Sequence, residues 1–265
     1  MAWDIEVVGG VAVVTMNSNK INAQDDGFFQ DLHEALDRVE ANHPRLSMVL
    51  TARGATFSAG LDFRQIVPLF LSDDQDEISA WWQRYRATNM RLFRLARPTV
   101  AAVNGHAIAG GFITAATCDF RVGVSEARYG LNEVRVGIPM PLEYLEIVRY
   151  TTGSAATNIL ALGGDLYDGE YMHKIGFLND LTNQAHLVER AVSLLSWMSV
   201  DTFDAYVASK AATHAPVEHA IKQLASETAQ LSGQALLTSS SAAARSSHRE
   251  RLRSRGASPK LRPER

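Results

Sequence analysis

Two short loops rich in glycine and small residues carry the pattern best suited to chemistry. They read Phe57-Ser58-Ala59-Gly60-Leu61-Asp62 and Asn104-Gly105-His106-Ala107-Ile108-Ala109-Gly110-Gly111, and each follows an apolar run that predicts a buried strand. Small side chains let a ligand approach backbone N–H groups closely, and donors at a helix start lie at the positive end of the helix dipole. Two such N–H groups aimed at one oxygen would form an oxyanion hole. On spacing alone, tight packing of the glycines explains these loops equally well.

Other common catalytic and binding patterns are missing from the chain. It has no G-x-G-x-x-G, no G-x-x-x-x-G-K and no Gly-x-Ser-x-Gly, so phosphate cradles and serine nucleophile elbows are not indicated. The eight histidines show no metal-ligand spacing, and the single cysteine, Cys118, excludes a disulfide within the chain. The sequence therefore predicts an enzyme with neither a metal site nor a separate cofactor.

The composition is that of an ordinary globular protein with an uneven distribution of charge. Of 265 residues, 46% are hydrophobic and 21% charged, which suits one large domain or one domain with an appendage. Residues 238–265 contain eight basic and two acidic side chains, which leaves 18 basic and 27 acidic ones in residues 1–237. This net-acidic body argues against a nucleic-acid partner. The basic tail is predicted to be a disordered extension, with contact to an anionic partner or a neighbouring subunit as the alternative.

The start of the chain and its hydropathy bear on its location. The N-terminus lacks a basic stretch followed by an apolar run, so no secretory signal is predicted. No stretch approaches the roughly eighteen consecutive apolar residues of a membrane helix. We therefore expect a cytoplasmic protein without membrane association.

Apolar periodicity predicts alternating strands and helices in the first half of the chain and helices in the second. Strands are expected at 5–8 and 11–16, joined as a hairpin by Gly9-Gly10, and at 46–51, 99–103 and 120–124. Helices are expected at 24–41, 77–95, 109–117, 142–150, 154–162, 169–175, 184–198, 202–212 and 217–231, and a variable loop over a ligand pocket at 67–76. This order predicts an α/β core with parallel strands, whose last helices pack either on the same chain or on a partner subunit.

Taken together, the two loops resemble those of the crotonase (enoyl-CoA hydratase/isomerase) superfamily. The first looks like that family's first oxyanion loop. The run from Arg97 to Gly105, with Ala109-Gly110-Gly111 and Cys118-Asp119, looks like the second. The resemblance covers residues 5 to 195 and implies an α/β fold, a crotonase-like spiral of ββα units with a C-terminal helical region.

The same resemblance implies an organisation and a substrate. It divides the chain into an acyl-CoA-binding core at 1–195, a helical oligomerisation region at 196–237 and the tail at 238–265. Homotrimers or hexamers are implied. The implied substrate is an acyl-CoA thioester, so coenzyme A is present only as part of the substrate.

The resemblance also implies roles for individual residues. The backbone N–H groups of Leu61 and Gly110 would hold the thioester oxygen, and the backbone around Ser58 and Ala59 would meet the adenine of coenzyme A. The second loop reads Ala-Gly-Gly where many relatives read Gly-Gly-Gly, a mild departure that should leave the Gly110 N–H in place. Asp62 would either cap the following helix or contact the ligand. The remaining residues of the implied substrate site are Gly60, Phe63, Gly111, Ile113 and Ile138.

The number of carboxylates separates the reactions of this superfamily. Its hydratases use two glutamates. The position of the first is Ile113 here, and the second is Glu133. Adding water needs a group that activates the water and a group that delivers a proton, whereas moving a double bond needs one base that shuttles a proton from C2 to C4. The chain thus looks most like the mitochondrial-type Δ3,Δ2-enoyl-CoA isomerases, with Glu133 as the proton shuttle.

Other interpretations remain open at this point. The chain could catalyse another acyl-CoA reaction, such as hydration or hydrolysis, or bind CoA esters without catalysis. Glu133, taken without the family resemblance, is best explained as a surface carboxylate paired with Arg128 or Arg135. In the isomerase interpretation, an apolar wall containing Ile113, with Ile138 and Phe112, would raise the pKa of Glu133 by desolvation.

Overall fold

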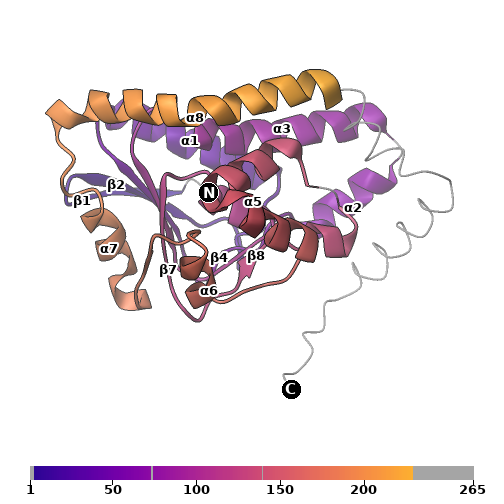
Figure 1. Ribbon diagram of the computed structural model, residues 1–265, viewed down its shortest axis with the longest axis horizontal. Helices are drawn as coiled ribbons and strands as arrows, with labels where there is room; N and C mark the ends of the chain where they lie inside the picture. The colour runs from indigo at the N-terminus through magenta and orange to yellow at the C-terminus, as the bar shows by residue number, and fades with distance from the viewer. Residues whose placement is uncertain (1–2, 73, 139, 229–265) are drawn as a thin grey trace.

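The computed structural model describes residues 3–72, 74–138 and 140–228, which fold as a succession of β-β-α units (Figure 1). The first unit is a hairpin followed by a helix. In each of the next three units, the first strand joins a large sheet and the second strand joins a small one. This repetition gives two sheets, and each sheet draws its strands from separate parts of the sequence.

The larger sheet has six strands in the order β1-β2-β3-β5-β7-β9. Strands β1 (Asp4–Val8) and β2 (Val11–Met16) form an antiparallel hairpin. Parallel pairing continues through β3 (Met48–Ala52), β5 (Thr99–Val103), β7 (Phe120–Gly123) and β9 (Asp180–Leu181). Both the predicted hairpin and the predicted parallel core are confirmed. Strands β3 and β5 are buried along their whole length, as expected when both faces of a parallel sheet are covered.

The smaller sheet has three parallel strands in the order β4-β6-β8. They are β4 (Thr56–Ser58), β6 (His106–Ile108) and β8 (Tyr129–Gly130). No strand was predicted at any of these positions, because two or three residues leave no periodicity to detect. All three strands run in the same direction, so their carboxyl ends meet at one edge of the sheet.

Helices surround the two sheets and complete a single hydrophobic core. Their bounds are α1 (Asp26–Asn42), α2 (Phe63–Leu71), α3 (Gln75–Phe93), α4 (Gly110–Ala116), α5 (Leu142–Gly163), α6 (Gly169–Lys174), α7 (Leu187–Ser193) and α8 (Val200–Thr228). Two short 3-10 helices are η1 (Glu133–Val136) and η2 (Gln184–His186).

An aspartate sets two of the helix starts that differ from the sequence-based expectation. The loop expected at 67–76 is wrong for 67–71 and 75–76, which lie in α2 and α3, while residue 73 lies outside the described residues. Helix α2 begins at Phe63, where Asp62 accepts a hydrogen bond from the Arg64 N–H. The helix expected from residue 24 begins at Asp26, because the Asp25 side chain accepts from the Phe28 N–H at 2.8 Å. Gln24 is therefore left outside α1.

The break predicted between the helices at 142–150 and 154–162 is present as a kink in α5 at Gly153, whose φ of 79° and ψ of 162° lie outside the helical region. The helices predicted at 202–212 and 217–231 form one helix as far as residue 228, where the described residues end. Helix α8 runs through Pro216. It lies beside α5 on the same chain, and Arg94 at the end of α3 donates to the Glu218 carboxylate at 2.7 and 2.8 Å. The chain thus covers its own core with α8.

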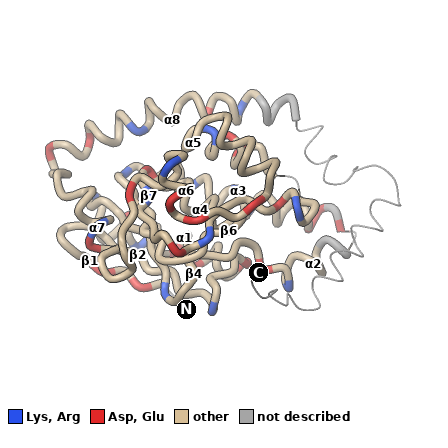
Figure 2. Tube along the Cα trace, turned by 60° about the horizontal axis from the view of Figure 1, so that its bottom comes forward, with Lys and Arg blue, Asp and Glu red and all other residues tan. Residues whose placement is uncertain are grey.

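Charged residues are dispersed over the described part of the chain. In Figure 2, both basic and acidic positions occur along α8 and α5 and across the loops. Some form exposed pairs, such as Arg45 with Asp204 at 3.0 Å. None of the helices in the described ranges has the length and apolar character needed to cross a membrane.

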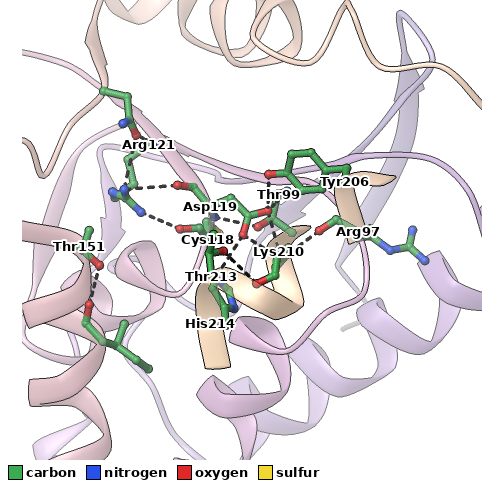
Figure 3. A network of polar contacts seen from close by, with 12 residues as sticks. Arg97, Thr99, Cys118, Asp119, Arg121, Thr151, Tyr206, Lys210, Thr213 and His214 are labelled. Atoms are coloured by element: carbon green, nitrogen blue, oxygen red, sulfur yellow. Dashed lines mark hydrogen bonds and ion pairs between the residues drawn. The ribbon is translucent and has the colours of Figure 1, made fainter. Parts of the chain in front are cut away.

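A buried polar network fastens α8 to the large sheet (Figure 3). The Lys210 Nζ lies 2.9 Å from Asp119 Oδ1 and donates to the Arg97 carbonyl at 2.9 Å. Asp119 Oδ2 accepts from the Tyr206 hydroxyl at 3.0 Å and from the Thr99 N–H at 2.8 Å. Both charged side chains are almost fully buried, so each depends on the other for compensation.

We expect Lys210→Met to lower the free energy of unfolding by about 3–5 kcal/mol, because it leaves the Asp119 carboxylate buried without a cation. Urea denaturation followed by circular dichroism measures this change. Lys222→Met is the matched control, since Lys222 is exposed on the same helix and its loss should change stability by less than about 0.5 kcal/mol. Equal effects of the two substitutions would refute the anchoring role of Lys210.

Candidate active site

Each strand of the small sheet leads to a residue that the sequence singled out. Strand β4 continues into the loop that contains Leu61, β6 leads to Gly110, and β8 is followed by Glu133 at the start of η1. Because these strands are parallel neighbours, the segments that follow them lie at the same edge of the sheet. Two main-chain amides and one carboxyl group from distant parts of the sequence are thereby brought to one place.

The direction of the Leu61 amide is set by its neighbours' pairing with Gln24. The Gln24 N–H donates to the Gly60 carbonyl at 2.8 Å, and the Asp62 N–H donates to the Gln24 carbonyl at 2.9 Å. Successive residues of an extended chain point their backbone groups to opposite sides, so the Leu61 N–H points away from Gln24. Among the described residues it has no hydrogen-bond acceptor.

The Gly110 amide opens α4 and also lacks an acceptor within the described ranges. Ala109, directly before it, has φ 51° and ψ −121°, and its own N–H donates to the Gly130 carbonyl at 2.9 Å. A Cβ on Gly60 would lie 3.0 Å from the Gly110 nitrogen, and a Cβ on Gly111 would lie 2.1 Å from the Ser58 carbonyl oxygen. Glycine is therefore required where the two loops meet, and both free amides belong to that contact.

Glu133 is buried, and only 8% of its surface is exposed. Its Oε2 has no hydrogen-bond partner among the described residues, and burial raises the pKa of its carboxyl to about 7, partly opposed by its own N–H. The alternative of a surface carboxylate paired with an arginine is wrong. Arg135 pairs with Asp165 and donates to the Gly163 carbonyl instead.

Tyr85 connects Glu133 to the amide of Gly110. A Cβ on Gly110 would lie 2.9 Å from the Tyr85 hydroxyl oxygen. Burial, first of all, and then the charges of Tyr144 and Glu133 raise the pKa of Tyr85. Its hydroxyl therefore lies against Gly110 and within electrostatic range of Glu133. Sequence reasoning missed Tyr85, because an aromatic residue at helical spacing in a long amphipathic segment gives no signal beyond core packing.

The three apolar residues predicted to surround Glu133 are all buried. Ile113 is fully buried in α4, one turn after Gly110, and Ile138 is also buried, with its N–H donating to the Glu133 carbonyl at 3.0 Å. Phe112 stacks on Phe177 with ring centroids 3.9 Å apart, so its ring belongs to the core packing. Of the three residues of the predicted apolar wall, Ile138 is the one joined to Glu133 by a hydrogen bond between their backbones.

The remaining predicted site residues line the first loop or follow it. The Ser58 hydroxyl donates to the Asn22 carbonyl at 2.7 Å, and the Ala59 N–H donates to the Ile21 carbonyl at 3.1 Å. Asp62 caps α2 and forms an ion pair with Arg64 at 2.7 Å, as the capping interpretation predicted. Phe63, with 42% of its surface exposed, begins α2 at the outer end of the loop. These contacts hold the loop in place and leave its outer face open.

Within the described part of the chain, no group of three or more His, Cys, Asp and Glu side chains could hold a metal ion. The groups that meet at the edge of the small sheet are the two amides and Glu133. Amides without acceptors can stabilise negative charge on an oxygen, and a carboxyl with a pKa near neutrality can take up and return a proton.

The raised pKa of Glu133 has a consequence for stability. The folded protein keeps this proton up to about pH 7, whereas an exposed glutamate releases it near 4.5. The folded state thus binds more protons between these values, so the free energy of unfolding falls by about 3 kcal/mol as pH rises through that window. We expect Glu133→Gln, which cannot ionise, to match the wild type below the unfolded pKa of 4.5, near pH 4, and to be more stable by about 3 kcal/mol at pH 8.

Urea denaturation at the two pH values measures this difference. Glu189→Gln, an exposed position on α7, is the control and should follow the wild type at both. Parallel stability curves for wild type and Glu133→Gln would show that the carboxyl of Glu133 ionises normally.

Comparison with known proteins identifies the fold and the family. The family model for enoyl-CoA hydratase/isomerase matches residues 6–255. A protein of Thermus thermophilus described as a candidate enoyl-CoA hydratase is 35% identical over 191 residues, which cover 70% of this chain and 73% of the relative.

Solved structures agree with this assignment at the level of the fold. Human mitochondrial Δ3-Δ2-enoyl-CoA isomerase superposes with a TM-score of 0.81 at 23% identity, covering 96% of each chain. An enoyl-CoA hydratase of Mycobacterium ulcerans superposes with a TM-score of 0.76 at 22% identity, covering 84% of this chain and 96% of that one. The predicted crotonase-like spiral of ββα units is thus confirmed. The chain belongs to the enoyl-CoA hydratase/isomerase family of the crotonase superfamily.

Proposed function

We propose that this protein is an enoyl-CoA isomerase that moves the double bond of a 3-enoyl-CoA to the 2-position. The Glu133 carboxylate takes a proton from C2. The electrons of that C–H bond form a C1=C2 double bond, and the π electrons of the thioester C=O move onto its oxygen. In this dienolate the C3=C4 double bond is intact, and the N–H groups of Leu61 and Gly110 stabilise the negative charge on the oxygen. Glu133 then returns the proton at C4: the C=O bond re-forms, the C1=C2 electrons become the C2=C3 double bond, and the C3=C4 electrons form the new C–H bond. The reaction consumes no other reactant.

The observation that carries this proposal is the isolation of Glu133 among buried carboxylates. Within the described residues, the other carboxyl side chains that are no more than 11% exposed each have a cationic partner, namely Arg64 for Asp62, Lys210 for Asp119 and Arg149 for Glu146. Glu133 has no such partner, and the position of a second hydratase glutamate is occupied by the buried, apolar Ile113. A single free carboxyl favours a reaction that needs one proton shuttle over one that needs two acid–base groups.

The protonation state of Glu133 also suits this role. Its pKa of about 7 means that carboxylate and carboxylic acid are both populated near neutral pH. A shuttle must act as a base at C2 and as an acid at C4, and both steps are fastest when the pKa lies near the working pH. Burial, which disfavours the charged form of the carboxyl, is the physical cause of that match.

Substrate, assembly and location follow from the family as part of the same proposal. The substrate is an acyl-CoA thioester, and no cofactor beyond its coenzyme A portion is proposed. The backbone around Ser58 and Ala59, with Gly60, would bind the adenine end. Assembly as a homotrimer or hexamer and a cytoplasmic location stay predictions.

We expect Glu133→Gln to lower the kcat for 3-hexenoyl-CoA isomerisation by roughly 10²–10⁴-fold with little change in acyl-CoA affinity, since it removes the proton carrier and keeps the shape of the side chain. Chromatographic analysis of the products and a binding titration with hexanoyl-CoA measure the two quantities. Glu189→Gln makes the same substitution at an exposed site and should leave both unchanged. A change confined to KM would contradict the proposed role of Glu133.

The same product analysis separates isomerisation from hydration. The wild type should convert 3-hexenoyl-CoA to 2-hexenoyl-CoA and should form little 3-hydroxyhexanoyl-CoA from 2-hexenoyl-CoA. Rapid formation of the 3-hydroxy product would make hydration the better assignment. If wild type and Glu133→Gln leave every acyl-CoA unchanged, the protein is a binding homologue without catalysis.

We expect Ile113→Glu to introduce measurable hydration of 2-hexenoyl-CoA, because it supplies a second carboxyl one helical turn from Gly110. Formation of 3-hydroxyhexanoyl-CoA is the measurement. Ile113→Gln is the matched control, since it has the same size without an acid group. Equal hydration by both variants would show that the new carboxyl plays no part.

A further inference from the structure

Gln24 contacts both loops that supply the amides. Its backbone pairs with Gly60 and Asp62 on either side of Leu61, at 2.8 and 2.9 Å. Its side-chain Nε2 donates to the Thr114 hydroxyl at 2.8 Å, one turn after Gly110 in α4. One residue, itself fully buried, thus spans the distance between the two proposed oxyanion donors.

A chain of buried hydrogen bonds fixes the direction of the Gln24 amide. The Tyr144 hydroxyl donates to the Tyr85 carbonyl at 3.0 Å, so its oxygen accepts from Asn89 Nδ2 at 3.1 Å. Asn89 Oδ1 therefore faces Thr114, whose hydroxyl has two acceptors for its proton, Asn89 Oδ1 and the Gly110 carbonyl, each at 3.0 Å. The Thr114 oxygen is then left to accept a hydrogen bond, and it receives one from Gln24 Nε2.

The same order of donors decides where the Gln24 oxygen lies. With Nε2 turned to Thr114, Oε1 faces Gly110, and a Cβ on that residue would come within 2.4 Å of it. Oε1 has no hydrogen-bond partner among the described residues. Leaving a buried acceptor unpaired costs about 1–3 kcal/mol, so this orientation persists because the rest of the network imposes it. The amide oxygen of Gln24 therefore lies directly against Gly110, the first residue of α4.

We infer that Gln24 is a positioning residue that holds the Leu61 and Gly110 amides in register, acting through Thr114 and the Asn89–Tyr144 network. The inference rests on the proposed function, because it concerns the aim of the oxyanion donors. The backbone of Gln24 orients the Leu61 N–H, and its side chain holds the start of α4, which carries the Gly110 N–H. Losing the side-chain contact should weaken stabilisation of the dienolate more than binding of the substrate.

Gln24→Met and Thr114→Val test this directly, because each keeps the size of the side chain and removes one end of the contact. The probe is hexanoyl-CoA labelled with ¹³C at the thioester carbonyl, which has no double bond to isomerise. Hydrogen bonds from the two amides should lower its carbonyl stretching frequency on binding to the wild type, as read by difference infrared spectroscopy. Both variants should lose roughly half or more of that shift and about tenfold in kcat, with KM changed by less than about twofold.

Further variants separate positioning from stability. Thr114→Ser keeps the hydroxyl and should retain the wild-type shift, and the double variant Gln24→Met/Thr114→Val should be no worse than either single variant. Thr51→Val is the matched control, because it removes a buried hydroxyl that donates to the Ala102 carbonyl at 2.9 Å in the large sheet. It should lower the Tm without altering the shift.

The outcomes distinguish this inference from the function on which it rests. If Gln24→Met and Thr114→Val both show the full wild-type shift, the positioning role of Gln24 is overturned and the proposed function is not affected. A wild type that binds the labelled thioester without any shift shows that no oxyanion hole acts on it, and the proposed function and the inference then fall together.

Discussion

Parallel pairing of three very short strands is the constraint on which the candidate site depends. Strands β4, β6 and β8 contain two or three residues each, yet their pairing brings the segments after them to one edge. Two of the three proposed functional groups are backbone amides, so the side chains at those positions matter chiefly through the space they leave. This explains why glycines occur at 60, 110 and 111, where any Cβ would meet the opposite loop or its supports.

Buried charge is treated in two ways in this fold. At the junction of α8 with the large sheet, the Asp119 carboxylate receives a lysine, a tyrosine hydroxyl and a backbone N–H. Glu133 has no cationic partner among the described residues, and desolvation raises the pKa of its carboxyl towards neutrality. The first arrangement stabilises a fixed charge and contributes to holding the chain together. The second arrangement allows the Glu133 carboxyl to gain and lose a proton near neutral pH, and it lowers the stability of the folded protein at alkaline pH. Such a shifted pKa is expected for a group that transfers protons.

Sequence patterns revealed the longer elements well and the site only through a resemblance. Strand β5 was predicted at its observed bounds, because five buried residues end at the turn signal Asn104-Gly105. The small sheet was invisible, since strands of two or three residues have no period. Helix α2 was missed although Asp62 had been recognised as a capping candidate. Flanking arginines made Glu133 look paired, and only tertiary contacts place it in the interior. Gln24 lay beside a helix start and carried no sign of its contacts with Gly60 and Thr114.

The backbone of Ala109 has an implication for how the second loop behaves when no ligand is bound. An alanine at φ 51° and ψ −121° occupies a conformation that a Cβ disfavours, which costs of order 1–3 kcal/mol. The peptide group that carries the Gly110 N–H is therefore held under tension by the bond to Gly130 and by the helix that follows. The direction of this N–H is therefore a property of the folded protein itself. Loosening any neighbour would let that peptide relax and rotate its N–H out of alignment.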